Sequence, residues 1–182
     1  YTVTTVALLG MSLPTFFFAT LLKLIFSVKL GWFDLVGLTG RDFNSLSQFG
    51  QILDMAKHLV LPIVTLVFIS IGPWMRYVRT NMLEVLNADY IRTARAKGLT
   101  EFAVVTKHAL RNALIPVITV LGPTVAGLLT GSFVVEKIFA IPGIGYYFVN
   151  SVTQRDYTTI MGVTIFFAAF LMAMVLLVDI FY

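Results

Sequence analysis

The sequence contains no cysteine, and only 12% of its 182 residues are charged. The absence of cysteine excludes disulfide bonds and thiolate chemistry within this stretch. The scarcity of charge excludes an ordinary soluble domain, in which about 25% of residues are charged. No Gly-x-x-x-x-Gly-Lys-Ser/Thr stretch is present, so the residues offer no nucleotide-binding loop. Histidine occurs only at positions 58 and 108, and we expect both to be solvated and too far apart for one metal site.

Apolar residues make up 58% of the chain and collect into long runs. A run of roughly 20 apolar residues is long enough to cross a bilayer as a helix. Strands are not favoured, because a barrel requires alternation that these uniformly apolar runs lack. We therefore predict an all-α, polytopic membrane protein. We expect Gly72-Pro73 to kink or weaken the second span and residues 122–124 to interrupt the third. The four predicted spans are residues 3–28, 59–77, 114–138 and 158–182.

Positive charge is concentrated in one connecting segment. Residues 76–111 hold seven basic and three acidic side chains, whereas residues 29–57 hold three of each and residues 136–157 two of each. Basic residues are enriched in cytoplasmic loops. We therefore predict that residues 76–111 are cytoplasmic, that the other two segments face outside, and that the chain starts and ends on the cytoplasmic side. Residues 29–57 are expected to form a loop with a short surface helix.

The stretch ADYIRTARAKGLTEFAVVTKHALRN has helix signals on both sides of one glycine. Asn87 and Asp89 are residue types that cap helix N-termini. Gly98 is the type that commonly ends a helix, and Thr100 can cap the next one. We predict a short helix over residues 89–97, a tight turn at Gly98, and a second helix that continues into the third span.

Three roles are compatible with this basic stretch. A solvated loop accounts for the charge alone. A helix bound to lipid headgroups accounts for basic residues near a membrane, although its apolar face is narrow. Docking to a cytoplasmic protein accounts for Tyr90, Ala94 and Lys97 on one side, where a small residue lets a partner approach closely. The residues by themselves leave these three roles open.

Two motifs resemble a known family. NADYIRTARAKGLTEFAVVTKHALRNALIPV is similar to the cytoplasmic loop of permease subunits of ABC importers, with the pattern Glu-Ala-Ala, three residues, Gly, nine residues, Ile-x-Leu-Pro. Aligned on Gly98, the chain keeps Ala94 and Leu110 of that pattern. It departs at Arg92, Thr93, His108 and Arg111. These departures are typical of the oligopeptide/dipeptide/nickel branch, and GSFVVEKIFAIPGIGYYFVNSVTQRDY resembles the outer segment of the same branch.

The resemblance implies that residues 1–182 are one transmembrane domain of such a permease, with the last four of six membrane helices and two more expected upstream. The short helix would be the coupling helix, which lies in a groove of a cytoplasmic ATP-binding subunit and transmits its closure to the membrane helices. The coupling residues implied in this way are Asp89, Tyr90, Arg92, Thr93, Ala94, Arg95, Ala96, Lys97, Gly98 and Leu99.

The family also implies partners. They are a second, homologous permease, two cytoplasmic ATP-binding subunits, an extracytoplasmic solute-binding protein and the bilayer of a bacterial or archaeal cytoplasmic membrane, without nucleic acid. ATP and Mg would be bound by the ATP-binding subunits, so we expect no cofactor, metal or catalytic residue in this chain. Peptides are the implied cargo, with nickel or another small solute as the alternative within the family.

The third span is rich in small residues and proline. Gly127 and Gly131 have the four-residue spacing that allows close helix packing. The alternative interpretation is that this span lines the translocation path beside the sister permease, with its prolines loosening the helix. The residues concerned are Pro116, Gly122, Pro123, Gly127 and Gly131.

A secondary transporter or channel is the competing class. It predicts ionisable residues inside several spans. Apart from residues that also belong to the connecting segments 76–111 and 136–157, only Lys23 and Asp179 occur there, both near span ends. We expect Lys23 to extend toward the membrane interface. Glu136 and Asp156 are expected at the outer rim, in weak exposed pairs with neighbouring basic residues. A membrane enzyme would need a clustered catalytic set, and the sequence suggests none.

Overall fold

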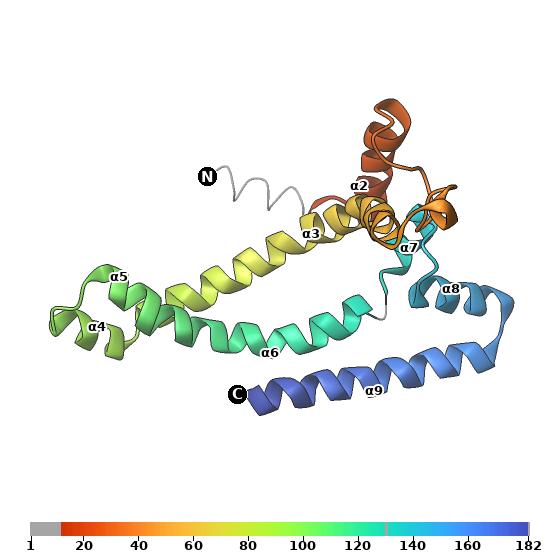
Figure 1. The fold of residues 1–182 in the computed structure, drawn as a ribbon. Helices are drawn as coiled ribbons and strands as arrows, with labels where there is room; N and C mark the ends of the chain where they lie inside the picture. Colours follow the sequence, from red (N-terminus) through yellow and green to blue (C-terminus); the bar gives the residue numbers. More distant parts are fainter. Residues whose placement is uncertain (1–11, 130, 182) are drawn as a thin grey trace. The chain divides into compact units, whose positions relative to one another are not determined.

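The structure is a computed structural model that describes residues 12–129 and 131–181. The described residues form helices and connecting segments and contain no strand, which confirms the all-α prediction for this part of the chain (Figure 1). The chain divides into two compact units. One comprises Tyr1–Gly72 and Leu128–Phe167, and the other comprises Pro73–Gly127 and Ala168–Tyr182.

Three long stretches are apolar enough to cross a membrane within the described ranges: Gln48–Leu86, Glu101–Leu128 and Tyr157–Ile180. They correspond to helix α3 (Gln48–Leu86), to the stretch that ends in α6 (Leu110–Leu129), and to α9 (Tyr157–Phe181). Three of the four predicted spans are therefore present as helices, although their limits differ from those predicted.

The first predicted span lies partly outside the described residues, which begin after residue 11. Its described part is α2 (Thr15–Leu22), which continues as a π-helical segment, η1 (Lys23–Lys29). Pro14 occupies the N-cap position of α2 with an extended backbone, where a proline costs no helical hydrogen bond.

Of the two predictions about proline, the interruption at residues 122–124 was wrong, and the kink or weakening at Gly72-Pro73 stays a prediction. Helix α3 begins before the predicted second span, ends after it, and runs through Gly72-Pro73 as a continuous helix. Helix α6 likewise runs through Pro116 and Pro123, so residues 122–124 do not interrupt it. Prolines are tolerated in membrane helices because neighbouring groups satisfy the backbone atoms that they free. The helical stretch ends at Leu129 instead, and a separate short helix, α7 (Phe133–Phe139), follows.

The first compact unit is built around the contact between α2 and α7. Ala19 and Leu22 of α2 are buried with Leu61 of α3, Val135 and Phe139. Lys23, which was predicted to extend toward the membrane interface, makes a hydrogen bond within this unit. Its Nζ donates a 2.8 Å hydrogen bond to the Ile138 backbone oxygen in the last turn of α7, where carbonyl groups lack helical partners. The expected short surface helix is only one 3-10 turn, η2 (Phe43–Ser45).

Glu136 and Asp156 are not members of exposed ion pairs, because each carboxylate binds a helix N-terminus. Glu136 Oε2 accepts a 2.7 Å hydrogen bond from the Tyr146 N–H in the first turn of α8 (Ile144–Gln154). A Cβ atom at Gly143 would lie 2.4 Å from this carboxylate, so the glycine gives Glu136 its room. Asp156 Oδ2 accepts a 2.6 Å bond from the Thr159 hydroxyl, and Oδ1 accepts the Thr159 N–H at 3.1 Å. These bonds, the hydroxyl bond first, hold the pKa of Asp156 below its usual value.

Candidate functional site

The basic stretch forms a helix, a tight turn and a second helix, as predicted. Helix α4 covers Asp89–Ala96, and Gly98 follows it with φ of 78°. The Gly98 N–H donates to the Arg95 carbonyl at 2.9 Å, and the Leu99 N–H donates to the Ala94 carbonyl at 3.4 Å. This pair of bonds is the Schellman motif, which requires a left-handed residue at the position of Gly98. Figure 1 shows α4 and α5 as the short helices that connect α3 to α6.

The two helix starts differ in their caps. Thr100 caps α5 (Glu101–Ala103) as predicted, since its side chain accepts the Ala103 N–H. The N-cap of α4 is Ala88, which makes no side-chain cap, so the expectation that Asn87 or Asp89 caps this helix was wrong. Helix α4 therefore gains little from its first turn, and its position depends on packing.

That packing comes from one apolar side of α4. Ile91 is fully buried and Ala94 is 7% exposed, and both lie in a cluster with Val104 and Ala109. The partly buried side chains packed against this cluster come from the end of α3: Met82, Val85 and Leu86. The spacing argument had placed Ala94 on the same docking side as Tyr90. Ala94 instead packs within its own chain, whereas Tyr90 is exposed.

A π-helical segment, η3 (Val104–Ala109), supplies the other half of this cluster. In a π-helix the backbone hydrogen bond spans five residues, so side chains five positions apart come toward the same side. Val104 and Ala109 are five apart and both fully buried. A regular α-helix would turn one of them away, so this irregular turn lets α5 and η3 pack under α4. Sequence reasoning did not identify these residues.

One ion pair closes the turn on its exposed side. Arg95 donates from Nη2 to Glu101 Oε1 at 2.6 Å and from Nε to Glu101 Oε2 at 3.1 Å. The hydrogen bond to Glu101 raises the pKa of Arg95 above its usual value. This bidentate geometry links the last turn of α4 to the first turn of α5 across Gly98. The sequence analysis had treated Arg95 only as a docking residue and did not identify Glu101 as its partner.

The predicted coupling residues thus divide between two roles. Ala94 holds the helix to its own chain, and Gly98 forms the turn. The others lie on the exposed surface: Asp89, Tyr90, Arg92, Thr93, Arg95, Ala96, Lys97 and Leu99. The exposed surface of α4 and its turn therefore carries three basic side chains on a helix whose opposite side is fixed.

The small and proline residues of α6 also divide. Pro116, Pro123 and Gly127 are spaced by seven and four residues, which places them on one side of the helix, and Pro123 and Gly127 are exposed. Gly122 is buried on α9, where an added Cβ would lie 2.8 Å from Val178 Cγ2 and 3.0 Å from the Met174 backbone oxygen. Gly131 lies beyond α6 with φ of 102°. Gly122 is therefore the glycine of α6 that packs closely on another helix, whereas an added Cβ at Gly127 would meet no atom within 4 Å. Gly131 is also closely packed, but beyond α6, where an added Cβ would lie 2.8 Å from the Gly145 backbone nitrogen.

No group of three or more His, Cys, Asp or Glu side chains that could hold a metal occurs among the described residues. His58 is not solvated as predicted, because its side chain is only 2% exposed. The arrangement around Gly98 likewise brings together no nucleophile and base. It offers a rigid, basic, solvent-exposed surface, which suits binding rather than chemistry.

Relatives of the chain are transport proteins. The chain is 49% identical to the dipeptide transport system permease protein DppB of Bacillus subtilis over all of its residues, and these cover 54% of that protein. It is 44% identical to the oligopeptide transport system permease protein AppB of the same organism, covering 56% of it. It is 38% identical to the oligopeptide transport system permease protein OppB of Haemophilus influenzae, covering 55% of it.

The chain thus spans about half the length of these relatives. All three are named as permease proteins of peptide transport systems. The family model for the inner membrane component of binding-protein-dependent transport systems matches residues 1–182. The chain belongs to the family of binding-protein-dependent transport system inner membrane components.

Proposed function

We propose that this chain is the membrane-spanning part of a permease subunit that imports peptides by alternating access, driven by ATP hydrolysis in cytoplasmic partner subunits. The observation that carries the proposal is the construction of α4. Its inner side is fixed by Ile91 and Ala94, while its outer side is exposed and basic. A helix anchored in this way transmits a push to α3 and α6 instead of yielding to it.

The same construction favours docking over the two other roles of the basic stretch. A solvated loop has no need of a buried cluster and a bidentate ion pair to hold its shape. A lipid-bound helix turns an apolar side outward to the membrane, whereas the apolar residues Ile91 and Ala94 of α4 face the protein. Contact with an ATP-binding subunit accounts for both a fixed inner side and a free outer side.

The remaining parts of the proposal follow from the family. The assembly would contain a second permease, two ATP-binding subunits that hold ATP and Mg, and an extracytoplasmic solute-binding protein. Peptides are the proposed cargo because the relatives cited above are named for dipeptides and oligopeptides. Nickel or another small solute is the alternative, and binding of radiolabelled peptide or nickel by the cognate solute-binding protein distinguishes them.

The test separates docking from turn formation. In proteoliposomes that contain the complete transporter, Lys97→Glu should weaken the contact with the ATP-binding subunits about tenfold, as the loss of a central interface residue commonly does. Uptake and solute-stimulated ATP hydrolysis should both fall. Lys107→Glu is the matched control, since this exposed lysine lies in η3 outside α4, and uptake should stay near the unaltered level.

Arg95 requires a double substitution because it also pairs with Glu101. Arg95→Glu alone should disturb the turn and reduce uptake. The charge swap Arg95→Glu with Glu101→Arg restores the pair, so recovery of uptake would assign Arg95 to the turn, and continued loss would assign it to docking. If Lys97→Glu leaves uptake intact, or if the permease purifies alone and transports without ATP, the proposed function is wrong.

A further inference from the structure

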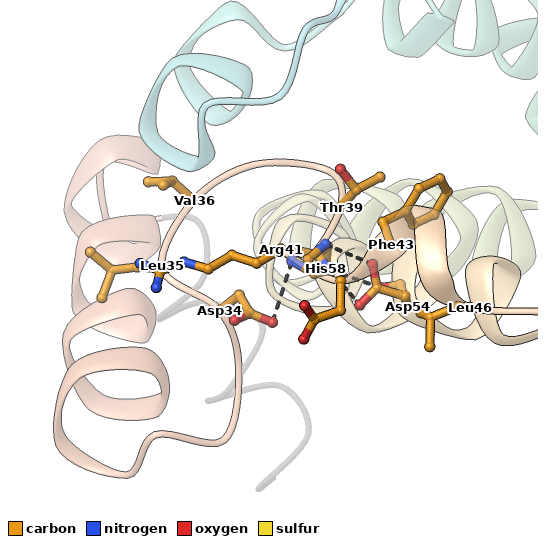
Figure 2. A pocket seen from close by; sticks show the side chains of 11 residues that line it. Asp34, Leu35, Val36, Thr39, Arg41, Phe43, Leu46, Asp54 and His58 are labelled. Carbon is orange, nitrogen blue, oxygen red and sulfur yellow. Dashed lines mark hydrogen bonds and ion pairs between the residues drawn. The ribbon is translucent and has the colours of Figure 1, made fainter.

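A cavity of about 690 Å³ lies between residues 34–46 and the first turns of α3 (Figure 2). Both of its walls belong to the same compact unit. The charged and titratable side chains that line it are Asp34, Arg41, Asp42, Asp54 and His58. The coupling function proposed for α4 makes no use of this cavity.

Two contacts attach the segment before η2 to α3. The Gly40 N–H donates to Asp54 Oδ2 at 2.7 Å, and a Cβ at Gly40 would lie 2.9 Å from the same carboxylate, so the chain can approach this closely only as glycine. One helical turn after Asp54, His58 Nε2 lies 3.3 Å from Asp34 Oδ2. Figure 2 shows the imidazole of His58 between these two aspartates.

The protonation of His58 decides whether its contact with Asp34 is attractive. Nδ1 lies 2.8 Å from the Asp54 backbone oxygen, which only accepts hydrogen bonds, so Nδ1 carries a hydrogen. In the neutral ring, Nε2 is then an acceptor that faces a carboxylate oxygen, another acceptor. Nε2 is buried without a hydrogen-bond partner among the described residues. Only the imidazolium form, with a hydrogen on both nitrogens, makes both contacts favourable.

We propose that His58 is a proton-operated clasp for residues 34–36. When the ring is protonated, Asp34 is held against α3 and the segment lies over the cavity. When the proton leaves, the Asp34 side chain faces a lone pair and loses its attachment to α3, so residues 34–36 become more mobile. The backbone stays attached at both ends, because Ser27 Oγ donates to the Asp34 oxygen, the Gly37 N–H donates to the Phe139 oxygen, and the Gly40 N–H donates to Asp54. The contact is therefore present at low pH, where the ring carries both protons, and is lost as pH rises.

Asp34 and Asp54 are the charged groups that contact the ring, and both favour its protonated form. Arg41 and Asp42 line the same cavity with opposite charges. The side chain of Asp34 is 52% exposed, so it has room to move into solvent once released. Because this segment is predicted to face outside, the clasp would respond to the external pH.

The test uses a spin label on the segment. The chain has no cysteine, so Val36→Cys, at a half-exposed position two residues after Asp34, gives a unique labelling site in this part of the protein. In the full-length permease within its complex in lipid nanodiscs, the ratio of mobile to immobile label should rise about tenfold between about pH 5.5 and about pH 8, because the attraction between the protonated ring and Asp34 is lost. A label at Phe49, which lies on α3 and is exposed, should not respond.

Two substitutions identify the partner. Asp34→Asn supplies an N–H donor to the neutral ring, so the Val36 label should stay immobile at high pH. Asp42→Asn removes the same charge from the same cavity but leaves the two aspartates that contact His58 unchanged, so the response should persist. A Val36 label that ignores pH overturns the proposal, as does a response that survives in Asp34→Asn or disappears in Asp42→Asn. None of these measurements depends on coupling to ATP hydrolysis.

Discussion

Position 98 favours glycine because of its backbone conformation and not because of crowding by neighbouring atoms. Its φ is 78°, and a Cβ at this position would meet no atom within 4 Å. Space is therefore available for a side chain, but most side chains disfavour the left-handed region by roughly 1–2 kcal/mol, with asparagine the common exception. The two bonds of the Schellman motif depend on this one residue, because a right-handed conformation there would direct Leu99 and Thr100 away from the turn.

Substitutions at Gly98 should therefore follow backbone preference and not side-chain size. Gly98→Asn should keep uptake near the unaltered level, Gly98→Ala should destabilise the turn by about 1 kcal/mol and reduce uptake, and Gly98→Pro should abolish it because proline fixes φ near −65°. Uptake in proteoliposomes, with membrane insertion checked by sedimentation, measures this order. Equal loss in the alanine and asparagine variants would instead indicate that a partner fills the space beside Gly98.

At the scale of elements, the sequence predicts those turns, caps and helices that depend on residues close together along the chain. Local residue types set three features that are confirmed: the turn at Gly98, the cap at Thr100 and the membrane-length helix α9. The π-helical segment η3 has no local signal, because it is selected by the burial of Val104 and Ala109 against other parts of the chain. The pairing of Arg95 with Glu101 was missed for the same reason, since it forms only after the turn is made.

The prolines of α3 and α6 also show that local residue types do not decide an element by themselves. Locally, Pro73 predicts a kinked or weakened helix and Pro123 predicts an interruption, because each removes one backbone hydrogen bond. In a long apolar stretch the alternative is worse, since a break exposes several backbone groups where no water can satisfy them. The helices therefore continue through both prolines, and only the left-handed glycine at 131 lies where the helix has ended.

Helix α6 offers a matched pair of glycines that separates packing from transport. Gly122→Leu should destabilise the protein by about 1–3 kcal/mol, because its Cβ would press on Val178 and on the Met174 backbone, which cannot move aside cheaply. A Cβ at Gly127 would meet nothing within 4 Å, so Gly127→Leu should leave the melting temperature unchanged. If Gly127 lies on the translocation path, the same variant should nevertheless reduce uptake.

Thermal unfolding of the purified permease in detergent measures the first effect, and uptake in proteoliposomes measures the second. Gly127→Ala is the control for the smallest added side chain and should be close to the unaltered protein in both measurements. A Gly127→Leu variant with unaltered uptake would remove this side of α6 from the proposed path, and a stable Gly122→Leu variant would contradict the contact with α9.

At the scale of the whole molecule, the length of α3 constrains how the chain crosses the membrane. The helix has 39 residues, which at about 1.5 Å per residue is roughly twice the thickness of the hydrocarbon core. Its two ends must therefore lie outside the hydrocarbon core if it crosses, with residues before Gln48 on one side and α4 on the other. The excess of basic residues in 76–111 then decides which side is cytoplasmic.

Cysteine labelling tests this orientation without altering the charges that set it. Asn44, Thr93 and Gln154 are uncharged and exposed, and this stretch has no cysteine of its own. In intact cells, a membrane-impermeant maleimide should label Asn44→Cys and Gln154→Cys but not Thr93→Cys, which should react only after the membrane is opened. Because α3 separates Asn44 from Thr93 and the stretch that ends in α6 separates Thr93 from Gln154, each crossing the membrane once, the three sites are linked, and an inverted permease would reverse all three. Labelling of Thr93→Cys from outside would therefore refute the cytoplasmic position of α4 and, with it, any role for this helix in contacting an ATP-binding subunit.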